Sequence, residues 1–469
     1  MSVSTIALLI VLTVFGFANA TDNLAAIGLA AIPSWIVVGV LYFLPLSLML
    51  AEFSSALPDK RGGIYSYMEL GLGPTWAFVG TWAYFVSNLV YLQSVLSRLV
   101  INISLASTGR DVFAGTTWAV PLLAVVLCVL LTWISTRGVR TFGRFVKTAG
   151  RVVLVCTFTL IAVAILAVAF GLHASASPYS VDALVPSFDL GYAATFAWLL
   201  FAVAGAESAG PYVHETENPK RDFPRAILSA TLIVTLLYVL GSVAASFLLP
   251  VGSIDKSTAV FECWKAAASI VGLPGDMAAR VVYTVIALVS VIAYVVWMES
   301  PIRAMFADVP EGTFPRFLTK HDAEGTHHNA LWTQAAVLTV LILVPLVSIF
   351  TGLSGSDRLV SLLNDLTSLA VVVPYFFVAI SYVRARRAGM VAPFQMVRST
   401  RLAIAIGWLT VAVSALAYCG AGLLALQSDP IDWVYVATVY FGPGLLIVVG
   451  LLLRSLSLAA HRARLETHD

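Results

Sequence analysis

The chain has 469 residues, of which 59% are hydrophobic and 11% charged, and its mean hydropathy is +0.92. A soluble domain carries roughly 25% charged residues, so this composition excludes a soluble protein and requires a surface that faces lipid. The net charge of +2 is too small to indicate a nucleic-acid partner. The four cysteines show no paired spacing for a disulfide or metal framework, and we expect neither a metal nor a cofactor.

Apolar blocks bounded by polar or Pro/Gly breaks predict about twelve membrane-spanning helices, because each span needs roughly 20 apolar residues. In chain order they cover residues 4–30, 34–56, 75–105, 118–135, 149–172, 191–212, 224–249, 279–303, 330–351, 359–383, 402–426 and 433–456. The blocks are continuous rather than alternating, which excludes a β-barrel. Residues 262–271 are expected to form a short helix on the membrane surface. Residues 1–20 are interpreted as part of the first span, because a signal peptide would carry a basic segment before its apolar run.

The basic residues predict the orientation of the chain in the membrane. With a cytoplasmic N-terminus, 21 Lys and Arg residues fall in inner segments and five in outer segments, while Arg98 lies within the third span. This bias indicates an even number of spans in a cytoplasmic (inner) membrane with both termini inside. Residues 457–469 then form a cytoplasmic tail. The lipid bilayer is an expected partner, and the sequence carries no signal for an oligomeric state.

The first and sixth spans each place glycine, other small residues and one carboxylate in the middle of an apolar block. The first span contains Gly16, Ala18, Asn19, Thr21 and Asp22, and the sixth contains Phe201, Ala202, Ala204, Gly205 and Glu207. Glycine weakens a helix, and a broken helix frees N–H and C=O groups for a ligand. The two spans hold equivalent positions in two sets of five helices, which is the pattern of an inverted repeat with substrate bound where the breaks meet. Close helix packing would also favour small residues, but it does not explain the carboxylates.

Three motifs resemble the amino acid–polyamine–organocation (APC) superfamily of transporters. The stretch from Phe201 to Glu207, continuing through Glu215-Thr-Glu-Asn-Pro219 to Ile227, is similar to that superfamily's helix 6 and the following loop. The segments Gly62-Gly-Ile-Tyr-Ser-Tyr67 and Ser300-Pro-Ile-Arg-Ala-Met305 are similar to its loop between helices 2 and 3 and to the end of its helix 8. The resemblance covers nearly the whole chain and is closest to the glutamate/GABA antiporter family.

The resemblance implies an all-α membrane protein with a LeuT-like 5+5 inverted repeat, broken helices 1 and 6, and two extra helices. The first repeat would cover residues 1–172, the second 191–383, and the extra helices 402–456. By resemblance, Phe201 matches the aromatic gate over bound substrate, Gly205 lies in the unwound turn, and Glu207 matches the glutamate linked to proton coupling. The first span departs from the superfamily's glycine- and serine-rich break, which leaves the mode of carboxylate binding open.

The residues themselves leave several roles open. Glu207, if buried without a cation, can exchange a proton near neutral pH, because desolvation disfavours its charged form; it can also anchor two helices. Asp22, about one turn beyond the break, can bind a substrate ammonium or face water near the outer end of the first span. Phe201 and Trp297 can wall the substrate site or serve in packing.

Five further polar residues lie within or beside the spans. Glu52 and Glu299 are expected to be inter-helix or loop anchors. Arg98 is expected to extend outward along the membrane. Asn364 and Asp365, which open the tenth span, are candidates for lining an outer vestibule.

The pattern favours secondary transport of amino acids or their derived amines, proton-linked and by exchange. An ion channel would show repeated pore motifs or rings of charge, and an intramembrane enzyme a nucleophile or metal constellation; neither is evident. The sequence contains no phosphate-binding glycine motif, so ATP-driven pumping is not expected. Because Arg98 is the one obvious intramembrane cation and is expected far from Asp22 and Glu207, neutral zwitterions or amines should bind better than glutamate at neutral pH. The family resemblance favours glutamate and GABA instead, and polyamine or neutral amino acid carriers are alternatives.

Overall fold

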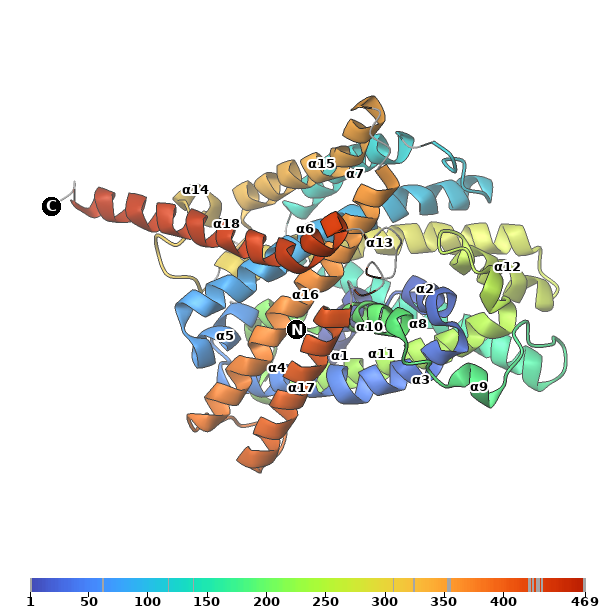
Figure 1. Ribbon diagram of the computed structural model, residues 1–469, viewed down its shortest axis with the longest axis horizontal. Coiled ribbons are helices and arrows are strands. Elements are labelled where there is room, and N and C mark those ends of the chain that lie inside the picture. The colour runs from blue at the N-terminus through green and yellow to red at the C-terminus, as the bar shows by residue number, and fades with distance from the viewer. Residues whose placement is uncertain are drawn as a thin grey trace.

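The structure is a computed structural model in which helices account for all regular secondary structure among the described residues. It describes residues 2–466 except 61–62, 117, 138, 307, 324, 352–355, 421–422, 424–425, 427–430 and 432. Figure 1 shows the helices packed side by side, with the last helix projecting beyond the rest toward the C-terminus. The all-α fold expected from the sequence is therefore confirmed.

The helices follow one another in this order: α1 (Val3–Val14), α2 (Phe17–Ile27), η1 (Gly28–Ala30), α3 (Ala31–Val38), η2 (Gly39–Phe43), α4 (Leu44–Ala56), α5 (Ile64–Leu72), α6 (Pro74–Thr108), α7 (Ala119–Ser135), α8 (Val139–Ala169), α9 (Val181–Leu184), α10 (Leu190–Ala202), η3 (Ala206–Glu215), α11 (Pro219–Leu248), η4 (Val251–Ser253), α12 (Ala259–Ile270), α13 (Gly275–Phe306), α14 (Arg316–Thr319), α15 (His328–Thr351), α16 (Ser356–Arg387), α17 (Thr400–Gly420) and α18 (Trp433–Glu466). Most ends agree with the expected spans within a few residues. The short helix expected over residues 262–271 is present as α12, and α18 continues through the predicted tail as far as Glu466.

Eight segments of the described chain are long and apolar enough to cross a membrane. The first, Val3–Ala56, has 54 residues and covers α1 to α4, which is more than one span requires. Two shorter apolar helices, Ala119–Ser135 and His328–Val344, lie where the fourth and ninth spans were expected. The chain is therefore a multi-pass membrane protein, while the count of twelve spans and the repeat boundaries at 172, 191 and 383 stay predictions.

The first expected break is present between α1 and α2. Phe15 and Gly16 have extended backbone conformations, so the helix stops at Val14 and restarts at Phe17. No side chain caps the new helix at Gly16. The start of α2, at Phe17 and Ala18, therefore lies inside the protein without a side-chain cap, and the partial positive charge of a helix N-terminus can act on a ligand there.

The second expected break separates α10 from η3. The α-helix ends at Ala202, and Gly205 has a φ of +127°, a conformation that side-chain-bearing residues rarely adopt. A Cβ at this position would lie 3.1 Å from Trp297 Cζ2 and 3.1 Å from Val14 Cγ2. Glycine is thus required both by the backbone turn and by the close approach of α1 and α13.

One buried tyrosine on α11 joins the two breaks. The hydroxyl oxygen of Tyr238 lies 2.9 Å from the carbonyl oxygen of Val14 and 2.8 Å from that of Ala202. It also accepts hydrogen bonds from the Gly16 N–H and from the Asn19 side-chain amide. Because the last carbonyls of α1 and α10 share this single hydroxyl, the two broken ends are held next to each other.

Candidate functional site

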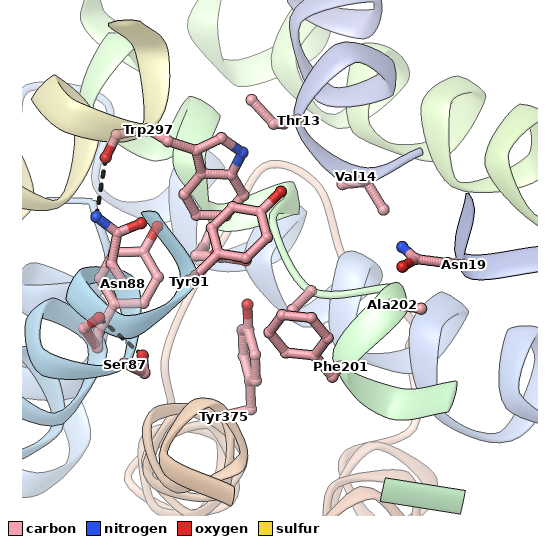
Figure 2. A pocket seen from close by; sticks show the side chains of 13 residues that line it. Thr13, Val14, Asn19, Ser87, Asn88, Tyr91, Phe201, Ala202, Trp297 and Tyr375 are labelled. Atoms are coloured by element: carbon pink, nitrogen blue, oxygen red, sulfur yellow. Dashed lines mark hydrogen bonds between the residues drawn. The ribbon is translucent and has the colours of Figure 1, made fainter. Parts of the chain in front are cut away.

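A cavity lies between the two helix breaks, enclosed by α1, α2, α6, α10, η3, α13 and α16 (Figure 2). Its lining consists of Thr13, Val14, Asn19, Tyr84, Ser87, Asn88, Tyr91, Phe201, Ala202, Ala204, Glu207, Trp297 and Tyr375. The cavity volume is about 30 Å³, which is room for about one or two water molecules. An amino acid is larger, so its entry requires the surrounding side chains to move.

Five of the residues expected at a substrate site line this cavity, together with Glu207, the residue expected to couple protons; the five are Asn19, Phe201, Ala202, Ala204 and Trp297. Gly16 and Gly205 shape its wall through their backbone rather than line it. Ala18 and Thr21 of α2 do not line it, and the Thr21 hydroxyl donates to the Ala18 carbonyl at 2.9 Å. Asp22 lies outside the lining as well.

Glu207 is the one carboxylate in the cavity lining, and it is 3% exposed. Its Oε2 accepts a hydrogen bond from the Gly205 N–H at 3.1 Å. Its Oε1 has no hydrogen-bond partner at normal distance among the described residues, although the hydroxyls of Tyr84 and Tyr375 are close enough to interact with the carboxylate. None of the lining residues is basic. A buried carboxylate in such surroundings is costly as an anion, which suits a group that takes up and releases a proton.

Three aromatic rings form one side of the cavity. Tyr91 packs edge-on against Phe201, with ring centroids 5.7 Å apart, and against Trp297 at 5.1 Å. Figure 2 shows the three rings gathered at the cavity between α1 and α16. The side-chain amide of Asn88 donates to the Trp297 carbonyl at 3.0 Å, which ties α6 to α13 beside these rings. The rings occupy space that a substrate needs, so Phe201 and Tyr91 are placed where a gate would have to move.

The expectation that Arg98 lies far from both carboxylates is wrong for Asp22. The Arg98 guanidinium donates to Asp22 Oδ2 at 2.6 Å, which joins α6 to α2. Sequence reasoning missed the pair because residues 76 positions apart give no local signal of contact. Since Arg98 neutralises Asp22, the negative charge expected near the substrate reduces to that of Glu207.

Glu52 and Glu299 also have partners. Glu52 is fully buried and pairs with Arg386 of α16 at 3.1 Å, so it anchors α4 to α16 as expected. Glu299 pairs with Arg303 one turn farther along α13 at 2.5 Å. The side chains of Asn364 and Asp365 lie outside the described residues, so their expected place at a vestibule stays a prediction.

Seven lining residues were not singled out from the sequence: Thr13, Val14, Tyr84, Ser87, Asn88, Tyr91 and Tyr375. A usable signal existed for two of them, because Ser87 and Asn88 are adjacent polar residues in the middle of an apolar span. The tyrosines gave no such signal, since a tyrosine in a membrane helix is equally suited to packing. Among the described residues, no group of three or more His, Cys, Asp and Glu side chains could hold a metal ion.

The chain is similar in sequence to several known proteins. A family model described as "Amino acid permease" matches residues 1–448. The aspartate/glutamate permease AcaP of Lactococcus lactis subsp. cremoris is 27% identical, with 96% of this chain and 94% of the relative covered. The inner membrane transporter YjeM of Escherichia coli K12 is 28% identical over 81% of each chain. A glutamate/gamma-aminobutyrate antiporter of Lactococcus lactis subsp. lactis is 24% identical over 64% of this chain and 60% of its own length.

A solved structure shares the fold. The crystal structure of MhsT in complex with L-phenylalanine has a TM-score of 0.62 and 15% sequence identity, and the match covers 89% of this chain and 98% of MhsT. That likeness confirms the LeuT-like architecture with broken helices 1 and 6. Because the family model covers nearly the whole chain, the protein belongs to the amino acid permease family of the APC superfamily and is a transporter of amino acids rather than an enzyme.

Proposed function

We propose that the protein is a proton-linked exchanger that binds an amino acid or a derived amine in the cavity between the two helix breaks. The observation that carries this proposal is the buried carboxylate of Glu207, which lines the cavity and meets no basic side chain there. A proton on Glu207 would remove the cost of a buried anion when the site is empty, or when the site switches from one side of the membrane to the other. Proton uptake and substrate binding would then compete for, or share, one site.

The polar groups around the cavity support a binding mode for the two ends of an amino acid. The uncapped N-terminus of α2, which follows Gly16 and includes Ala18 and Asn19 in its first turn, favours the substrate carboxylate. Asn88 Oδ1 and Glu207 Oε1 belong to lining side chains, are buried acceptors with no hydrogen-bond partner among the described residues, and favour the ammonium. Phe201 and Trp297 would close over the bound molecule.

The proposed orientation places both termini in the cytoplasm of a cytoplasmic membrane. The distribution of 21 basic residues in inner segments against five in outer segments supports it. One relative, YjeM, is named an inner membrane transporter. Accessibility labelling of single cysteines in loops on each side would test this orientation directly.

Counterflow in proteoliposomes tests the exchange mechanism. Vesicles loaded with an unlabelled amino acid should take up the same labelled amino acid, whereas empty vesicles should take up little. Only a carrier with one alternately exposed site shows this dependence on the internal substrate. Equal uptake by loaded and empty vesicles would contradict exchange, and strict dependence on ATP would contradict secondary transport.

The charge of the cavity predicts which substrates bind best. We expect neutral zwitterions and amines to compete better than glutamate at neutral pH, because a second substrate carboxylate about 4 Å from ionised Glu207 would be repelled by several kcal/mol at an effective dielectric of about 20. Protonation of Glu207 relaxes this repulsion, so glutamate should gain affinity as the pH falls.

A thermal-shift and competition screen measures this preference, with glutamate, aspartate, GABA, neutral amino acids and polyamines compared at acidic and neutral pH. The printed names of two relatives favour an acidic substrate instead. Glutamate or aspartate as the tightest ligand at neutral pH would contradict the charge argument and leave amino acid transport unaffected.

A further inference from the structure

A second cavity lies between α6 and α13, separate from the one between the helix breaks. Its volume is about 340 Å³, and its wall is mainly apolar, with Leu99 and Ile103 on α6 and Ala287, Leu288 and Val291 on α13. Ile103 is 46% exposed and Leu288 is 64% exposed. Both helices are long and apolar enough to cross a membrane. This groove therefore opens sideways toward the hydrocarbon of the bilayer rather than toward the substrate cavity.

The guanidinium of Arg280 lies at one end of the groove, where hydrogen bonds hold it in place. The exposed guanidinium of Arg280 donates through Nε to the Ala106 carbonyl at 3.2 Å and through a second nitrogen to the Ser107 carbonyl. Ala106 and Ser107 both line the groove, as does Thr284, whose hydroxyl donates to the Arg280 carbonyl at 3.0 Å. These contacts hold the guanidinium where the apolar wall ends. The described contacts use only part of its five N–H donors, so others remain for an anion.

We propose that this groove binds a phospholipid, with one acyl chain along the apolar wall and the phosphate at Arg280. An apolar groove that ends at an arginine suits a molecule whose hydrocarbon chain ends at an anionic phosphate. Burial of methylene groups stabilises the chain, and the planar guanidinium binds phosphate oxygens in pairs. On the proposed orientation, this end of α6 lies at the outer leaflet, so the lipid belongs to that leaflet.

The position of the groove connects the lipid to transport. Val291 and Trp297 are six residues apart on α13, about 9 Å along the helix, and Leu99 and Tyr91 are eight residues apart on α6, about 12 Å. The same two helices thus carry the groove at one level and the aromatic wall of the substrate cavity at another. A bound acyl chain would set the distance between α6 and α13 just outside the rings that a substrate must displace.

Native mass spectrometry of the purified full chain with added dioleoyl-phosphatidylglycerol tests the site. We expect Arg280→Gln to weaken lipid binding about fivefold, the effect of one basic side chain at an anionic headgroup. Leu288→Trp fills the groove and should weaken binding about tenfold, the effect of roughly two fewer buried methylene groups. Dioleoylglycerol, which lacks the phosphate, should bind the unmodified protein about as weakly as phosphatidylglycerol binds the Arg280 variant.

Two matched variants separate this site from lipid binding elsewhere. Leu416→Trp places the same ring at a residue of α17 that is 63% exposed, and Lys256→Gln removes an exposed cation from a loop. Both should bind phosphatidylglycerol like the unmodified protein. Equal binding by all four variants, or equal binding of the two lipids by the unmodified protein, would overturn the proposal. Because the readout is lipid binding itself, the result does not depend on the proposed exchange of amino acids.

Discussion

Replacing Glu207 with Gln is expected to uncouple amino acid accumulation from a proton gradient. If one proton accompanies each substrate, an inward gradient of one pH unit is worth about 1.4 kcal/mol and supports about a tenfold accumulation. Glutamine keeps the size of the side chain and can still accept the hydrogen bond from the Gly205 N–H, but it cannot ionise. The accumulation ratio should therefore fall to the value measured without a gradient, and the pH dependence of uptake should flatten.

The measurement is labelled uptake into proteoliposomes loaded with unlabelled substrate, with and without an imposed pH gradient. Glu217→Gln is the matched control, because Glu217 is exposed just after η3 and its loss should leave the pH dependence intact. Yield and thermal stability of the Glu207 variant should stay near those of the unmodified protein. An unchanged pH profile would assign Glu207 a purely structural role, and a collapse of folding would show that it anchors helices.

The fold could be predicted from the sequence because two strong signals occur along the same chain: continuous apolar blocks and glycines within two of those blocks. Apolar blocks define most helix ends within a few residues, since the bilayer penalises any other arrangement; α8 is an exception, because it begins at Val139, ten residues before the expected span. The breaks were predictable because Gly16 and Gly205 stand where an uninterrupted helix would otherwise be favoured, and Gly205 indeed adopts a conformation suited to glycine. Glu207 was predictable for the same local reason, because its carboxylate lies beside the second break.

The contacts across the site could not be predicted, because they depend on how distant helices rotate against one another. Tyr238 bridges both breaks, yet nothing in the sequence around it distinguishes its hydroxyl from that of any other buried tyrosine. Tyr375 lies 170 positions from Gly205, whose N–H donates a hydrogen bond to the Tyr375 hydroxyl oxygen. The Asp22–Arg98 pair could not be predicted for the same reason, and it reduces the negative charge of the expected site.

A buried ion pair away from the cavity leads to the second prediction of large effect. The Arg386 side chain is 4% exposed and pairs with the fully buried Glu52, while its second terminal nitrogen donates to the Val397 carbonyl at 2.6 Å. Glu52 also accepts from the Tyr382 hydroxyl at 2.6 Å and from the Met396 N–H at 2.9 Å. The segment before α17 is thereby tied to both α4 and α16.

Arg386→Met should lower the free energy of unfolding by about 3–5 kcal/mol, because it leaves Glu52 buried without its cation. The thermal unfolding midpoint of the purified protein measures the loss. Arg384→Met, an exposed change on the same helix, should have little effect. The double variant Glu52→Leu with Arg386→Met should recover much of the stability, since replacing both charges removes the unpaired ion. A midpoint unchanged by Arg386→Met would contradict the anchoring role.

The same variant separates anchoring from proton coupling. Tyr382 lies four residues before Arg386 on α16, and Tyr375, which lines the cavity, lies seven residues before Tyr382. Loosening this end of α16 should therefore reduce uptake per folded molecule, because the Tyr375 side of the cavity is held less firmly. The pH dependence of the remaining uptake should persist, since Glu207, the group proposed to exchange the proton, is untouched. Loss of that pH dependence in the Arg386 variant would instead place the titrating group at Glu52.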